Sequence, residues 1–256
     1  MSRKPKKMTL DEIKKMEAVC RLAAEALQLA GKMVKPGVTS QEINDAVHEF
    51  TLSKGCLSAP LNYHGFPKSI CTSINDVVCH GVPQEGEVLN DGDIINVDVT
   101  LIKEGFYGDT SRTFFVGDVS DEAKRITQAA QESMYAGIDQ VKHKARTHDI
   151  GFASEKIAKK YGYFPVRDIG GHGIGKAFHL DPFVPAVGPK GTGPRIMENT
   201  CLTVEPMINA TSHRYETFQI PNSNITYFRT LDGSLSAQFE HTILVTSDGR
   251  HVLTEW

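Results

Sequence analysis

The spacing of apolar residues predicts helices in two parts of the chain. Over residues 11–31, apolar side chains recur every three or four positions, as on the buried face of an amphipathic helix, and Thr9 is a suitable N-cap. Thr39 is followed by Glu42 in the pattern of a capping box, which predicts a second helix ending near residue 53. Two further helices are predicted at residues 120–142, capped by Ser120, and 149–161, capped by Asp149.

Extended segments follow each pair of helices. The glycine-rich segment 170–179 and residues 181–200 are expected to be loops. Strands that come in groups predict an α+β fold with an antiparallel or mixed sheet, and the repeated order suggests two similar halves. Short runs rich in β-branched and apolar residues lie at 69–73, 76–79, 94–102 and 106–116, and later at 164–169, 200–207, 215–220, 225–230 and 237–246.

Residues 93–116 have the pattern of a β-hairpin that carries two aspartates. If residues 103–105 form the turn, Asp98 and Asp109 lie opposite each other on one face, with Cβ atoms roughly 5 Å apart. Two carboxylates so placed are destabilising unless they share a proton or bind a cation. A register shifted by one residue would put them on opposite faces, where both would be solvated. The hairpin alone leaves both arrangements open.

Composition and charge narrow the class of protein. A formal net charge of −3 gives no reason to expect nucleic acid or a membrane surface as the main partner. Residues 1–8 hold four cations and no acid, which predicts a disordered tail, or else a docking site for a polyanion, ahead of a single domain over residues 9–256. No long apolar run follows, so neither a secretory signal nor a membrane span is expected. Five cysteines without a C-x-x-C pair indicate a reducing compartment, and we expect the cytoplasm.

Several acidic residues and histidines stand among apolar or glycine-rich residues, most of them in the second half of the chain. Glu205 and Glu240 stand within predicted strands, although either one alone would more often face solvent from an edge strand. His172 lies among four glycines, which let the backbone approach other groups closely. His179 follows seven residues later, and His80 ends a strand. Each histidine alone would more often be an ordinary surface or core residue.

Taken together, these residues favour a metal centre. The set has too much negative charge to gather without cations and suits two divalent metals, which would activate water for hydrolysis. A competing motif, G-x-x-x-x-G-K at residues 170–176, resembles a phosphate-binding loop, but Ala177 replaces the hydroxyl residue that would hold magnesium. The candidate ligands are Asp98, Asp109, His172, Glu205 and Glu240.

The chain resembles the type I methionine aminopeptidases from about residue 11 to residue 252. The motifs that carry the resemblance are YHGFPKSICTSINDVVCHGVP (63–83), DGDIINVDV (91–99), GDTSRTF (108–114), GHGIGKAFH (171–179), TVEPM (203–207) and SLSAQFEHT (234–242). The resemblance implies the pita-bread α+β fold, with pseudo-twofold halves and a central antiparallel or mixed sheet covered by helices. It also implies co-translational removal of the initiator methionine from polypeptides whose second residue is small.

The resemblance also implies roles for the candidate ligands. Asp98 and Asp109 would chelate two divalent ions of cobalt, manganese, iron, zinc or nickel, and Asp109 and Glu240 would bridge them. His172 and Glu205 would complete one site, and Glu205 would act as the general base. His80 would contact the substrate amine or amide nitrogen, and His179 the scissile carbonyl or its oxyanion.

Further positions match the family's substrate and cation sites. The pocket departs from that of many bacterial relatives at Pro60, at Phe66 and around Thr226 and Tyr227. The positions that match the methionine pocket are Tyr63, Phe66, Cys71 and Phe178, with His80 and His179 beside it. Those that match a site for one monovalent cation, sodium or potassium, are Asn75, Val77 and Ser236.

Two alternatives stay open beside the methionine aminopeptidase interpretation. Peptidases that cleave X-Pro bonds share the fold but usually carry an extra N-terminal domain. Non-catalytic binding modules on this fold usually lose metal ligands. The partners that the resemblance implies are nascent polypeptide N-termini, with a transient ribosome contact, and the protein is expected to be a monomer.

Overall fold

The computed structural model describes residues 6–256 and has an α+β architecture, as the sequence predicts. Its α-helices are α1 (Leu10–Met33), α2 (Ser40–Ser53), α3 (Asp121–Ile138) and α4 (Thr147–Tyr161), and a single 3-10 turn, η1, covers Tyr63–Gly65. The strands of the first half are β1 (Leu57–Ser58), β2 (Cys71–Ile74), β3 (Val77–Cys79), β4 (Ile94–Lys103) and β5 (Phe106–Phe115). Those of the second half are β6 (Phe164–Pro165), β7 (Gly171–Ile174), β8 (Leu180–Val184), β9 (Cys201–Val204), β10 (Met207–Asn209), β11 (Tyr215–Gln219), β12 (Thr226–Thr230), β13 (Ser236–Val245) and β14 (Arg250–Val252).

The helices form where the caps predict them. Thr9 and Thr39 each make a complete capping box, and the Ser120 side chain accepts a hydrogen bond from the first turn of α3. The predicted cap at Asp149 is wrong, because α4 begins at Thr147. The Asp149 carboxylate instead reaches back to the Arg146 backbone N–H, as the third residue of a capping box does.

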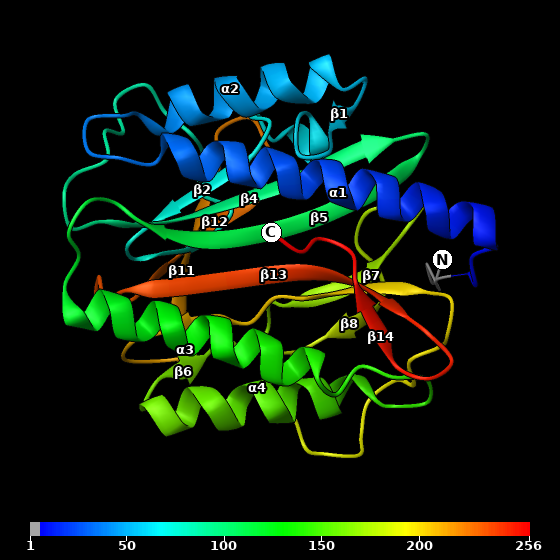
Figure 1. The fold of residues 1–256 in the computed structure, drawn as a ribbon. Helices are drawn as coiled ribbons and strands as arrows, with labels where there is room; N and C mark the ends of the chain where they lie inside the picture. The colour runs from blue at the N-terminus through cyan, green and yellow to red at the C-terminus, as the bar shows by residue number, and fades with distance from the viewer. Residues whose placement is uncertain (1–5) are drawn as a thin grey trace.

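Helices cover the two halves of one large antiparallel sheet (Figure 1). Across the middle of this sheet the strands run in the order β1-β4-β5-β13-β9-β7-β8. Helix α1 packs on β4 and β5 with α2 beside it, whereas α3 packs on β13 and contacts α4. Two separate apolar clusters lie under these helix pairs, each fully buried at its centre. The carboxylate-bearing strands β5 and β13 meet along the seam between the halves.

The turn of the β4–β5 hairpin differs from the expected one. Lys103 pairs with Phe106 across a two-residue turn, Glu104–Gly105, whose φ angles are 49° and 78°. Positive φ at both central residues is the mark of a type I′ turn, whose twist matches that of the flanking strands. The predicted three-residue turn is therefore wrong.

This turn changes how the two aspartates face each other. Asp98 pairs with Ser111, and Asp109 pairs with Thr100. The predicted direct pairing of the aspartates is wrong, since they are diagonal neighbours, which are separated by about 7–8 Å and by somewhat less between their Cβ atoms. A shift by an even number of residues keeps both side chains on one face, so they still point into the same space.

Strands also occur where loops were expected. His172 stands on β7 within the glycine-rich segment, and β8 lies at the start of the supposed loop 181–200. The backbone beyond residue 175 bends and is not helical. A strand is hard to predict in a glycine-rich sequence, because glycine lowers the apparent strand propensity even where the backbone pairs.

The chain before α1 contacts the second half. The Lys7 ammonium lies 2.7 Å from the Glu198 carboxylate, and the Met8 N–H donates to the Asn199 carbonyl at 2.7 Å. Of the predicted disordered tail, residues 1–5 fall outside the described range, and the division into tail and single domain stays a prediction. Among residues 6–256, no helix is long and apolar enough to cross a membrane.

Candidate active site

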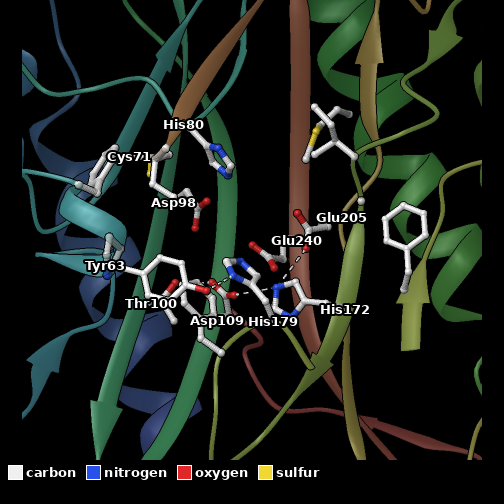
Figure 2. Close-up of a pocket in the computed structure, with 18 of the residues that line it drawn as sticks. Tyr63, Cys71, His80, Asp98, Thr100, Asp109, His172, His179, Glu205 and Glu240 are labelled. Carbon is white, nitrogen blue, oxygen red and sulfur yellow. Dashed lines mark hydrogen bonds and ion pairs between the residues drawn. The ribbon is translucent and has the colours of Figure 1, made fainter. Parts of the chain in front are cut away.

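A cavity of about 250 Å³ opens on the face of the sheet opposite the helices (Figure 2). Its floor is formed by β4, β5 and β13, which carry Asp98, Asp109 and Glu240. His172 enters from β7, and Glu205 from the end of β9. The five candidate ligands, which lie far apart in the sequence, therefore line one cavity.

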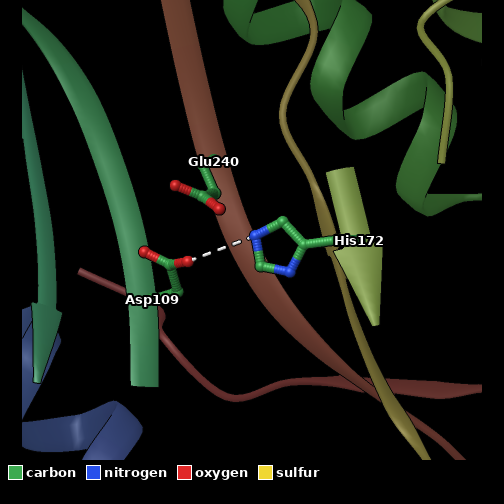
Figure 3. A group of neighbouring side chains, drawn as sticks. All are labelled: Asp109, His172 and Glu240. Carbon is green, nitrogen blue, oxygen red and sulfur yellow. Dashed lines mark ion pairs between the residues drawn. The ribbon is translucent and has the colours of Figure 1, made fainter. Parts of the chain in front are cut away.

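Three of these residues form the tightest group (Figure 3). One ligand atom from each of Asp109, His172 and Glu240 lies within 4.8 Å of the others, and all three residues are buried. The His172 Nε2 atom lies 3.5 Å from the Asp109 Oδ2 atom. Both carboxylate oxygens of Glu240 are buried and have no hydrogen-bond partner in the described structure. A buried, unpaired carboxylate is costly, so this donor set suits a bound cation.

Glu240 is buried because its strand is central. β13 lies between β5 and β9, and Glu240 is 1% exposed. The ordinary expectation for a single glutamate, an edge strand facing solvent, is therefore wrong here. Burial first, and then the charges of Asp109, Glu205 and Asp98, raise the pKa of Glu240 well above its usual value.

Asp98 and Asp109 differ in how they are held. The Thr100 hydroxyl donates to Asp109 Oδ1 at 2.6 Å, across the β4–β5 pair. Asp98 lines the same cavity but stands outside the close group of three. Burial, followed by the charges of Asp109 and Glu205, raises the pKa of Asp98 well above its ordinary value. Repulsion between these carboxylates is the electrostatic signature of a site that gathers positive charge.

Glu205 is fixed by donors on both oxygens. The Thr203 hydroxyl donates to Oε1 at 2.8 Å, and the Gln238 amide donates to Oε2 at 3.2 Å. The His172 Nε2 atom lies 3.6 Å from Oε1. Burial raises the pKa of Glu205, and the nearby His172 only partly opposes this.

The glycines around His172 allow neighbouring strands to approach closely. A Cβ atom on Gly171 would lie 2.3 Å from the Thr203 carbonyl oxygen, and one on Gly173 would lie 2.2 Å from that of Asp181. The His172 Nδ1 atom lies 3.0 Å from the Gly173 carbonyl oxygen, to which it can donate. That bond leaves Nε2 facing the carboxylates, the tautomer that a metal-binding histidine needs. Burial lowers the pKa of His172, but the nearby Asp109 and Glu205 outweigh burial and raise it overall.

His80 and His179 both line the cavity, and both have left-handed backbone conformations. Their φ angles are 59° and 54°, which is unusual for a residue other than glycine and typical of functional sites. The His80 Nδ1 atom lies 3.1 Å from the Thr226 carbonyl oxygen, and burial lowers the pKa of this ring. The His179 Nδ1 atom lies 2.9 Å from the Tyr63 hydroxyl. The rings of His172 and His179 are 4.6 Å apart.

The predicted pocket residues meet at one end of the cavity. Phe66 and Cys71 are buried in a small cluster with Ile220, and Tyr227 packs at its edge. The rings of Tyr63 and Phe178 are 5.1 Å apart. Pro60 and Ile225 complete this end of the lining. The result is an apolar recess directly beside the carboxylates.

The predicted monovalent-cation residues are also neighbours. The Ser236 N–H donates to the Asn75 carbonyl at 2.8 Å, and the Asn75 side chain donates to Asp93. Val77 follows on β3, which pairs with β12. The structure brings these three residues into one neighbourhood, and their role stays a prediction.

Residues that sequence reasoning missed stand two positions from the candidate ligands. Thr100 follows Asp98 on β4, Thr203 precedes Glu205, and Gln238 precedes Glu240 on β13. Side chains two apart on a strand share a face, so the alternation was a usable signal. Asp168, which lines the cavity mouth, falls within the predicted strand 164–169, but β6 ends at Pro165 and the chain bends at Asp168, so no alternation marked it.

Comparison with known proteins agrees with this arrangement. The model of metallopeptidase family M24 matches residues 14–247. The chain belongs to this family. A methionine aminopeptidase of Rickettsia prowazekii is 49% identical over 240 residues, which cover 94% of this chain and 91% of the relative.

Solved structures of M24 relatives extend the comparison. A crystal structure of methionine aminopeptidase from Rickettsia prowazekii matches with a TM-score of 0.94 at 47% identity, covering 98% of this chain and 100% of that one. The prolidase from Pyrococcus horikoshii matches with a TM-score of 0.73 at 22% identity, and this chain covers only 63% of it while 97% of this chain is aligned. The prolidase likeness therefore shows the shared fold alone.

Proposed function

We propose that this protein is a methionine aminopeptidase that removes the initiator methionine from new polypeptides whose second residue is small. The observation that carries the proposal is the buried carboxylate and histidine cluster beside an apolar recess. Similarity over nearly the whole chain to a relative named methionine aminopeptidase supports it. We further propose that the enzyme acts in the cytoplasm as a monomer, on nascent chains and with a transient ribosome contact.

We propose that the cluster holds two divalent cations. Asp98 would chelate one of them, Asp109 and Glu240 would bridge the pair, and His172 and Glu205 would complete the other site. The buried oxygens of Glu240 and the His172 Nε2, which faces Asp109 and Glu205, fit this donor set. Bound there, such cations polarise a carbonyl and lower the pKa of water. Cobalt, manganese, iron, zinc or nickel would suit these ligands, and Asn75, Val77 and Ser236 would hold one sodium or potassium ion.

In this proposal Glu205 moves the proton. Its carboxylate lines the same cavity as the other proposed ligands, where it can accept a proton from water and release it again. It would take the proton from the attacking water and return it to the leaving amine. The donors Thr203 and Gln238 hold its carboxylate in one orientation throughout.

The two histidines would present opposite hydrogen-bonding atoms to the substrate. His80 donates from Nδ1 to the Thr226 carbonyl, which leaves Nε2 as an acceptor for a substrate N–H. Where the Tyr63 hydroxyl donates to His179 Nδ1, the His179 Nε2 carries a hydrogen that can be donated to the scissile carbonyl. The recess formed by Tyr63, Phe66, Cys71 and Phe178 would take the methionine side chain.

The second candidate function, cleavage of X-Pro bonds, has less support. The prolidase from Pyrococcus horikoshii is only 22% identical to this chain, and this chain covers 63% of it. A non-catalytic module would not need five candidate ligands in one cavity.

A peptide panel tests the proposal. The chelated protein is supplied with each divalent metal in turn and assayed on Met-Ala-Ser, Met-Leu-Ser and Ala-Pro. Release of methionine from Met-Ala-Ser but not from Met-Leu-Ser is expected. Cleavage of Ala-Pro alone would favour the second candidate, and no turnover with any metal would leave a binding module.

A further inference from the structure

The cavity has two walls, on either side of the clustered carboxylates. Tyr63 and Cys71 belong to the wall beside β4, whereas Phe183 and Met207 come from β8 and β10 on the other side of β13. Figure 2 places Tyr63 and Cys71 on one side of Glu240, and His172 and Glu205 on the other. If methionine occupies the recess of the first wall, which rests on the proposed function, the rest of the substrate leaves along the second wall.

Asp168 stands at the mouth of this second wall. It lines the cavity and is exposed, and over the described residues it makes no hydrogen bond or ion pair. Burial is the largest cause that raises the pKa of Tyr215 on β11, and the negative charge of Asp168 is the second. The neighbouring Arg167 lines a separate groove with Glu155 and Val187, so it points elsewhere and does not neutralise Asp168.

Asp168 decides the net charge of the cavity lining. Apart from the five proposed ligands, Asp168 is the one acidic residue in the cavity lining, and no lysine or arginine of the described chain lines it. Two divalent cations would balance the four carboxylates among the ligands. Asp168 then leaves a net negative charge along the substrate's exit path.

Chain geometry sets the substrate position that Asp168 can reach. Asp168 is four residues before His172, so their Cα atoms are at most about 14 Å apart on a fully extended chain. A substrate leaving in extended form also advances about 3.3 Å per residue. Asp168 therefore lies within reach of the residues that follow the small second residue.

We propose that Asp168 is a specificity-determining residue that favours substrates with lysine or arginine at the third or fourth position and disfavours those with acids there. The contact is an ion pair at a solvent-exposed mouth. A cationic peptide is expected to exceed its acidic counterpart by about two- to fivefold in kcat/KM, the scale of an exposed ion pair.

The test uses amidated peptides, so that no terminal carboxylate competes. The metal-loaded enzyme is assayed on Met-Ala-Xaa-Ser-amide and Met-Ala-Ser-Xaa-amide, in which Xaa is lysine, serine or glutamate. The lysine-to-glutamate ratio should exceed one for at least one position. It should shrink toward one in 1 M salt, where charges are screened beyond about 3 Å.

Variants then assign the effect to Asp168. Asp168→Asn should bring the ratio to about one, and Asp168→Lys should invert it. Asp121→Asn, which removes an exposed aspartate on α3 outside the cavity, is the matched control and should leave the ratio as in the wild type.

The outcomes separate this inference from the proposed function. Turnover of the serine peptides with equal rates for lysine and glutamate peptides would overturn the role of Asp168 while leaving the aminopeptidase intact. A preference that survives in both Asp168 variants would also overturn it. Absence of turnover on every peptide would instead contradict the proposed function.

Discussion

Glu205 shows how single residues around the cavity depend on one another. Its two oxygens take hydrogen bonds from Thr203 and from Gln238, and the Thr203 hydroxyl also accepts from the His172 backbone N–H at 3.0 Å. Each of these donors stands two positions before a candidate ligand on its strand. The same alternation that buries the acids therefore supplies the groups that orient them.

Replacing Glu205 by glutamine tests its role as a proton carrier. Glutamine keeps a carbonyl oxygen that can accept from Thr203, so the fold should persist, but the amide cannot take up a proton. We expect kcat on Met-Ala-Ser to fall by about 10²-fold or more. Steady-state kinetics of the metal-loaded variant measure this.

Two measurements make the Glu205 result decisive. Thermal unfolding should show a midpoint close to that of the wild type, and Glu85→Gln, on an exposed loop, should retain full activity. Near wild-type kcat in Glu205→Gln would remove this residue from proton transfer.

At the residue level, sequence reasoning found the ligands but not their supports. Asp98, Asp109, His172, Glu205 and Glu240 could be named because charged residues are unusual inside apolar strands and because their motifs match a known family. Asp168 could not be found, since an acid in an irregular segment has no pattern to mark which cavity it faces.

The β4–β5 hairpin is the element on which the site geometry depends. Its type I′ turn sets the register, and the register puts Asp98 and Asp109 on one face. The sequence indicated the strands and the shared face. It did not indicate the register, because a Lys-Glu-Gly segment permits both a two-residue and a three-residue turn, and only pairing along the full strands decides between them.

Gly105 should be needed for this turn because of its backbone conformation alone. Its φ is 78°, and no atom lies within 4 Å of the position that a Cβ atom would occupy, so Gly105→Ala introduces backbone strain without a clash. We expect a loss of about 1 kcal/mol in the free energy of unfolding, measured in urea.

Gly86→Ala is the matched control for this substitution. Gly86 also has open space around its Cβ position but is not among the glycines with positive φ. Its change should stay within about 0.5 kcal/mol. Equal effects at the two positions would show that the turn conformation of Gly105 does not matter.

Across the whole molecule, buried charge makes stability depend on pH. Glu87 lines a large groove away from the catalytic cavity, and one of its carboxylate oxygens is buried without a hydrogen-bond partner in the described structure. Burial raises the pKa of Glu87 above its ordinary value, although Ser40 and Arg229 oppose this. An acid whose pKa is raised by folding favours the folded state when protonated, and that contribution is lost as the pH rises through the folded pKa.

Glu87→Gln should therefore be more stable than the wild type at pH 7. The gain should be below about 1 kcal/mol, because the side chain is only half-buried and solvent screens its charge. The difference should shrink as the pH falls toward 4, where the wild-type carboxyl is also neutral. Urea unfolding at pH 4, 5.5 and 7 measures this, with Glu85→Gln in the same loop as the control, and a difference that grows at low pH would contradict the sign.

The seam between the two halves of the sheet concentrates buried negative charge. β5 and β13 come from different halves, and their pairing brings Asp109 and Glu240 together. Sequence reasoning could predict two groups of strands but not this seam, since no local pattern specifies which strands of different groups will pair. The cost of gathering these carboxylates is a property of the whole fold, and it should be visible in the stability of the protein with and without metal.

Glu240→Gln separates the cost of this charge from the benefit of a cation. Wild-type protein should gain stability when manganese is added after chelation, by about 2.7 kcal/mol at a hundredfold excess over Kd. Chelated Glu240→Gln should be more stable than chelated wild type, because it removes a buried carboxyl group that burial and the charges of Asp109, Glu205 and Asp98 make costly to ionise. The same variant should lose most of the gain from manganese. These opposite signs in one variant, measured by thermal unfolding, are expected only if Glu240 is buried to bind a cation. A chelated variant less stable than chelated wild type would mean that the carboxylate supports the fold itself.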